Sequence, residues 1–93
     1  MIIGTMIVEI SLGDTFSLKD KRQIVKSIIE RLKNRYNISI AEVDRQDDIR
    51  RAVIGMACVS TTGEHAGRQL DHVLSFMEND GRFTVEKVEK EIL

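Results

Sequence analysis

The chain of 93 residues has the length of one folded domain, because two separate cores would each be too small to bury enough apolar surface. Its 42% hydrophobic and 31% charged residues exclude a disordered tail, and no apolar run approaches the ~20 residues that cross a bilayer. The lone Cys58 excludes an intramolecular disulfide and, with an N-terminus that lacks a basic segment, predicts a cytoplasmic protein.

The first predicted element is a strand, because the apolar residues Met6, Val8, Ile10 and Leu12 alternate with Thr5, Ile7, Glu9 and Ser11. This period of two is typical of a strand with one buried face. The strand is expected to end at "GDTF", residues 13–16, in which Gly13 and Asp14 favour a turn.

A helix is predicted to begin at Ser17, because Ser17 and Asp20 have the spacing of a capping box. Asn34 and Asn37 tolerate the left-handed conformation and are expected to end it. The apolar residues between these ends recur at helical spacing and define the face toward the core. They are Leu18, Val25, Ile28, Ile29, Leu32 and Tyr36.

Two strands are predicted next. The first covers Ile38–Val43, and its apolar phase changes between Ile40 and Ala41, which indicates a bulge there. The second covers Ala52–Val59 and is apolar on both alternations, as in the centre of a sheet. The connection "DRQDDIRRA" favours cross-strand salt bridges, and the alternative is that its arginines extend a basic surface.

A second helix and a last strand complete the chain. Thr61 and Glu64 have the spacing of a capping box, and Gly81 is expected to end the helix. The tail also fits helical spacing, but Thr84 and Val85 favour a strand. The inner stripe of the helix is predicted to contain Ala66, Leu70, Val73, Leu74 and Met77.

The order β-α-β-β-α-β predicts a ferredoxin-like α+β sandwich over residues 1–93, with two helices on one face of a four-stranded antiparallel sheet. Ile3 and Ile7 are expected on the uncovered face. An apolar open face favours self-association, so a homodimer is expected. The third strand adds one of two sets to this face, either Ala52, Ile54, Met56 and Cys58 or Val53, Ala57 and Val59.

Chemistry that depends on a metal, a cofactor or a nucleophile is not predicted. His65 and His72 are separated by about 10 Å along their helix, too far to share one ion. No nucleophile motif or carboxylate pair is present, so we do not expect an enzyme. The central strands also lack the aromatic residues on which RNA bases stack.

The charge distribution gives the strongest functional signal. The segment Ser17–Tyr36 holds seven basic and two acidic residues, although the whole chain has a net charge of −1. We expect this helix to bind the phosphates of structured RNA or of a ribosomal particle. The alternatives are a small-anion site at the helix N-terminus and an ordinary solvated face supported by pairs such as Lys26 with Glu30. The candidate anion-binding residues are Ser17, Lys19, Lys21, Arg22, Lys26, Arg31, Lys33 and Arg35.

The segments "SLKDKR", "RLKNRYNISIAEVD" and "RRAVIGMACVS" resemble the YlxP-like family of small bacterial and archaeal proteins. The resemblance covers nearly the whole chain. It implies a ferredoxin-like fold and a C-terminal strand. In bacteria the genes of this family often lie beside translation genes, which implies a link to the ribosome. It carries over no catalytic residue.

Overall fold

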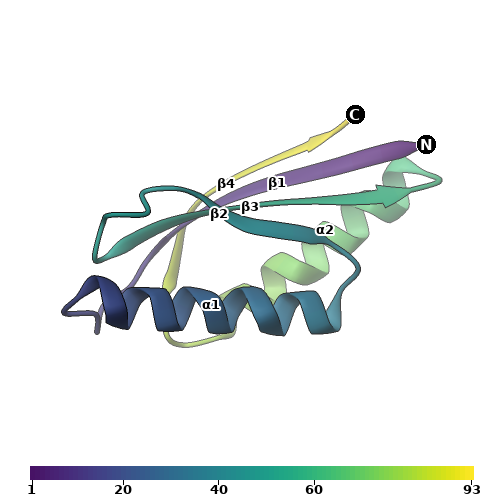
Figure 1. Cartoon of the computed structure of the whole chain (residues 1–93). Coiled ribbons are helices and arrows are strands. Elements are labelled where there is room, and N and C mark those ends of the chain that lie inside the picture. Colours follow the sequence, from purple (N-terminus) through teal and green to yellow (C-terminus); the bar gives the residue numbers. More distant parts are fainter.

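The computed structural model describes all 93 residues and contains four strands and two helices (Figure 1). In chain order they are β1 (Ile2–Ser11), α1 (Leu18–Arg35), β2 (Ser39–Asp44), β3 (Arg51–Ser60), α2 (Gly63–Glu78) and β4 (Thr84–Ile92). The predicted order of elements is confirmed, including a strand rather than a helix at the C-terminus.

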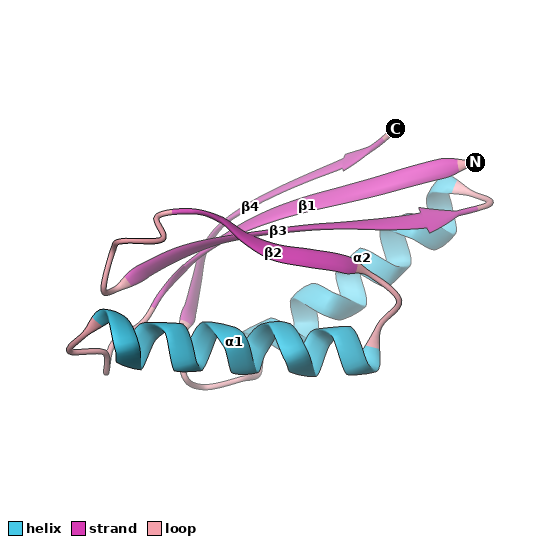
Figure 2. Cartoon of the chain, viewed as in Figure 1, coloured by secondary structure: helices cyan, strands magenta, loops and turns pink.

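The strands form one antiparallel sheet in the order β2-β3-β1-β4. Figure 2 shows α1 and α2 on the same side of this sheet, with the opposite side uncovered. The predicted ferredoxin-like α+β sandwich is therefore confirmed. Neither helix is both long enough and apolar enough to cross a membrane.

The pairing of β1 with β3 decides which alternation of β3 is buried. Met6 and Val8 of β1 are 0% exposed and lie opposite Met56 and Ile54 of β3. Directly opposed residues point to the same face of a sheet, so this alternation of β3 faces the helices. The buried set is Ala52, Ile54, Met56 and Cys58, and the open-face set is Val53, Ala57 and Val59.

β2 contains a bulge, but the predicted position after Ile40 is wrong. The register shifts between Glu42 and Asp44, so Val43 is the extra residue. Its side chain lies over Gly55 of β3, where an added Cβ atom would be 2.9 Å from Val43 Cγ1. The close approach of these two strands on the open face therefore favours glycine at this position.

The N-cap of α1 and the place where the helix ends are confirmed, but the expected left-handed asparagine at its C-terminus is not found. Ser17 Oγ accepts a hydrogen bond of 3.1 Å from the backbone N–H of Asp20. At the other end, Tyr36 adopts an extended conformation with φ −127°, and neither Asn34 nor Asn37 is left-handed. Residues 36–38 then connect the helix to β2.

The ends of α2 also differ from the prediction in detail. Thr62, not Thr61, is the N-cap and accepts a hydrogen bond of 3.1 Å from the backbone N–H of His65. The hydroxyl of Ser60 accepts a hydrogen bond from the backbone N–H of Thr62, so the chain turns into the helix one residue later than predicted. Gly81 is left-handed, with φ 88°, but it lies in the loop after the helix rather than at its cap.

Candidate anion-binding surface on α1

Lys21 lies inside the protein, so its predicted role as a phosphate contact is wrong. It is 0% exposed, and its Nζ atom lies 2.8 Å from Glu42 Oε2 and donates to the carbonyl of Arg45. The helical repeat explains the burial, because Lys21 precedes Val25 and Leu32 by four and eleven residues and shares their face.

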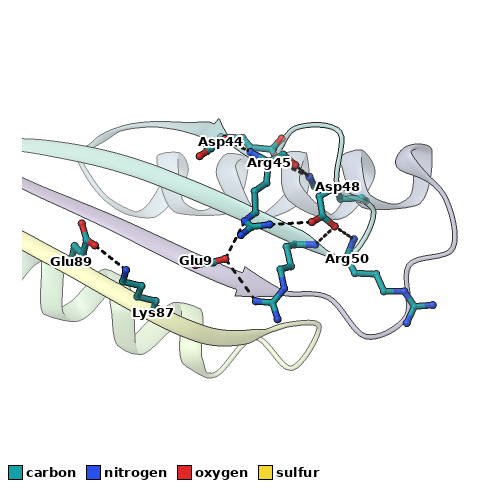
Figure 3. Close-up of polar contacts among 10 residues, drawn as sticks. Glu9, Asp44, Arg45, Asp48, Arg50, Lys87 and Glu89 are labelled. Atoms are coloured by element: carbon teal, nitrogen blue, oxygen red, sulfur yellow. Dashed lines mark hydrogen bonds and ion pairs between the residues drawn. The ribbon is translucent and has the colours of Figure 1, made fainter.

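Lys21 holds the connection between β2 and β3, which is drawn in Figure 3. Arg45 is left-handed there, with φ 60°, and pairs with Glu9 at 3.1 Å. Arg51 lies 3.7 Å from the same carboxylate, so the predicted cross-strand salt bridges are confirmed. The backbone N–H groups of Arg50 and then Arg51 hold the pKa of Asp48 below its usual value.

Arg31 and Arg35 point toward α2. Arg31 Nη1 lies 3.3 Å from Asp80 Oδ2, and Arg82 binds the same carboxylate at 2.6 Å. The hydrogen bond from the Arg82 side chain is the main reason that the pKa of Asp80 lies below its usual value. Both guanidinium groups also lie over the ring of Phe76, that of Arg35 at 4.8 Å and that of Arg31 at 5.3 Å from its centroid.

The remaining four basic residues of α1 form an exposed row on its outer side. The helical repeat places them within about 60° of one another and over ~21 Å of helix length. No carboxylate forms an ion pair with any of them, and the pair expected between Lys26 and Glu30 does not form. This basic row consists of Lys19, Arg22, Lys26 and Lys33.

The basic row borders the edge strand β2. Arg22, Lys26 and Lys33 line a shallow depression together with Ile29 and two carboxylates, those of Glu30 on α1 and Glu42 on β2. Glu42 is 15% exposed and its charge is matched by the buried Lys21. The outer side of α1 therefore keeps an excess of positive charge.

The N-terminus of α1 is less suited to a small anion than the sequence indicates. The hydroxyl of Ser17 accepts the N–H of Asp20, and Asp20 Oδ2 lies 3.3 Å from the backbone nitrogen of Phe16, from which it accepts a hydrogen bond. A carboxylate thus already stands at the positive end of the helix dipole. We assign Ser17 to capping rather than to anion binding.

The open face of the sheet is apolar at its centre. Ile3 and Ile7 lie on it, as expected from their alternation with the buried residues of β1. Ile7 is 43% exposed and lies opposite Gly55, and small residues leave a shallow hollow beside it. On the neighbouring edge, Lys87 and Glu89 of β4 form an ion pair of 3.3 Å (Figure 3). Self-association through this face stays a prediction.

The histidines and the cysteine lie apart. Cys58 is 3% exposed in the core, and no group of His, Cys, Asp or Glu is placed to hold a metal ion. His65 Nδ1 lies 2.8 Å from Ser60 Oγ, a spacing that nucleophile–base pairs also have. That hydroxyl also accepts the N–H of Thr62, the N-cap of α2, and no carboxylate orients the imidazole, so we assign the pair to the turn that leads into α2.

Sequence reasoning missed a groove where the end of α1 meets α2. Two adjoining depressions share Arg35, Tyr36 and His72, and aromatic and polar residues of α2 extend them. The only signal in the sequence is a stripe of α2 residues at helical spacing, which starts at His65 and includes Phe76. We name this feature the helix groove.

The strand order, with both helices on one face, defines a ferredoxin-like α+β domain. The chain belongs to the family of proteins of unknown function DUF503, whose model matches residues 3–90. It is 36% identical over 78 residues to the uncharacterized protein YlxP of Bacillus subtilis (strain 168), covering 84% of this chain and 85% of that protein. The resemblance to YlxP-like proteins is thereby confirmed.

Among solved structures, the chain is similar to the de novo designed protein Foldit4. The TM-score is 0.55, with 14% sequence identity over 100% of this chain and 97% of that chain. This likeness concerns the fold alone.

Proposed function

We propose that the protein is a non-enzymatic binding module that docks on the phosphate backbone of structured RNA, such as that of a ribosomal particle, through the basic row. The observation that carries the proposal is the distribution of partners along α1. Lys21 and Arg31 contact carboxylates within the fold, whereas the basic row has none and faces solvent. Unpaired cations along one helix side suit a row of phosphates.

The size of the expected salt effect follows from the number of cations. If all four members of the basic row contact phosphates, the release of counterions makes log K fall against log salt with a slope of about −2.8 to −3.6. Affinity should then fall roughly 50- to 150-fold between 50 and 200 mM salt. Such contacts fix position without reading bases, so little sequence preference is expected.

The test is fluorescence anisotropy with labelled fragments of structured ribosomal RNA over a series of salt concentrations. Arg22→Gln combined with Lys26→Gln should lower the slope by about half, because two of the four contacts are lost. The matched control is Lys87→Gln combined with Lys90→Gln, which removes the same charge from β4. Equal losses in both double variants, or binding that does not respond to salt, would contradict the proposal.

A second candidate is a homodimer formed through the open sheet face. It is favoured by the exposure of Ile7, at 43%, and of Val59, at 60%, on a face that no helix covers. Light scattering over a range of concentrations tests it. We expect a dimer for the wild type and a monomer for Ile7→Asp, and a monomeric wild type would refute the idea.

A further inference from the structure

The helix groove has a lining without carboxylates, although the chain holds 15 acidic residues. Two arginines and two histidines contribute to it, namely Arg35, Arg68, His65 and His72. All four side chains can donate hydrogen bonds. The composition of the lining therefore favours an anion over a cation.

The helical repeat of α2 explains this separation of charge. Asp71 and Glu78 lie about 100° and 120° around the helix from His72, outside the lining of the groove, and Asp71 pairs with Lys90 of β4 at 2.6 Å. Arg68 contacts Glu64 at 3.4 Å, but both side chains are more than half exposed. A pair so open to solvent holds Arg68 weakly and leaves it able to turn to a ligand.

The groove is held in shape by contacts between α1 and α2. The rings of Tyr36 and Phe76 meet edge to face, with centroids 6.1 Å apart and an angle of 79°. The hydroxyl of Tyr36 donates to the carbonyl of His72 at 3.3 Å, and Gln69 Nε2 donates to the carbonyl of Asn37 at 3.1 Å. These bonds fix the chain where it leaves α1.

Arg35 is the central donor of the groove. It lines both depressions, and its guanidinium lies 4.8 Å from the Phe76 centroid and 5.9 Å from that of Tyr36. It forms no ion pair, so its fork of N–H groups is available for the bidentate binding that phosphate prefers. The aromatic rings beside it offer apolar surface to a planar group.

We propose that the helix groove binds a nucleoside phosphate, with the phosphate on Arg35 and Arg68 and the base against Tyr36 and Phe76. The ligand is either a free nucleotide or the terminal phosphate and base of an RNA strand. The groove lies on the α2 side of α1, across the helix from the basic row, so this inference does not depend on RNA docking there.

Calorimetric titration of the full chain with adenosine monophosphate tests the proposal, with adenosine and inorganic phosphate as partial probes. Each partial probe should bind at least tenfold more weakly than the nucleotide, because it engages only half of the groove. Amide chemical shifts should change around Arg35 and along α2. Absence of binding at millimolar nucleotide, or shifts confined to other surfaces, would overturn the proposal.

Two substitutions and one control locate the site. Arg35→Gln and Arg68→Gln should each weaken nucleotide binding by about tenfold, because each removes a charge-assisted hydrogen bond. Lys87→Gln removes the same charge from β4, outside the groove and the basic row, and it should leave nucleotide binding unchanged. An equal loss for Lys87→Gln would refute the assignment. Arg68 is exposed, so its variant serves even if Arg35→Gln disturbs the fold.

The source of the ligand is decided with two RNA oligonucleotides that differ only in a terminal phosphate or hydroxyl. Tighter binding of the phosphorylated strand, lost in Arg35→Gln but retained in Lys87→Gln on β4, supports the strand end as ligand. Equal binding of both strands, together with nucleotide binding that Arg35→Gln weakens, supports the free nucleotide. Arg35 is outside the basic row, so Arg35→Gln tests nucleotide binding without changing the residues proposed to dock RNA. Failure of the nucleotide proposal can therefore be distinguished from failure of the RNA proposal.

Discussion

Replacing Lys21 by methionine should strongly destabilise the protein. Methionine replaces the unbranched apolar stem of lysine but leaves the charge of Glu42 without its partner and the carbonyl of Arg45 without its donor. Glu42 Oε2 has no hydrogen bond of its own, so the charge of Lys21 is its main compensation. Breaking a buried pair costs about 3–5 kcal/mol, and the 15% exposure of Glu42 favours the lower end.

A loss of about 3 kcal/mol should lower the melting temperature by roughly 12–24 °C, from about 4–8 °C per kcal/mol for a domain of this size. Circular dichroism during thermal and urea unfolding measures it. Lys21→Met combined with Glu42→Leu should recover most of the loss, because no charge is then left unpaired. Lys26→Met on the exposed side of α1 is the control, with a change within about 0.5 kcal/mol. If Lys21→Met costs no more than this control, the reasoning is refuted.

Two further predictions concern pH and capping. Arg82 lowers the folded-state pKa of Asp80 below its unfolded value of about 4. The stability that this pair contributes is therefore present above about pH 4, and it is lost as the pH falls through the folded-state pKa. Urea unfolding should therefore show wild type more stable than Asp80→Asn at neutral pH, with the difference shrinking below about pH 4; a constant difference would contradict this. Ser17→Ala should cost about 1 kcal/mol in the same assay, because Asp20 N–H loses its acceptor, whereas Ser17→Asp should retain most of the stability.

The order of elements was predictable largely because β1, α1 and α2 each have a regular apolar period, and these periods are local. The alternation in β1 and the stripe Val25, Ile28 and Leu32 in α1 each fixed a buried face without tertiary information. The bulge at Val43 was not predictable, because its position depends on the space above Gly55 in another strand. Pairing between strands, not the sequence of β2 alone, sets that register.

The sequence predicted which helix carries the basic residues, but it did not predict which of these residues form an exposed surface. A count of charges treats Lys21 like its neighbour Arg22, although the helical repeat puts Lys21 on the apolar face. The partner of Arg31 comes from the loop before β4, and the rings beside Arg35 come from α2 and the end of α1. Residues that meet only through folding leave no mark in a one-dimensional pattern.

This geometry decides how variants of α1 must be combined. Lys33 and Arg35 are two residues apart but point about 160° apart around the helix, so they belong to the basic row and to the helix groove respectively. A double substitution of these two would mix both proposed activities. Charge reversal of Lys21 with Arg22 would be harder still to interpret, because the buried half unfolds the protein while the exposed half tests phosphate binding. Variants grouped by side of the helix, rather than by neighbourhood in the sequence, keep stability, RNA docking and nucleotide binding separable.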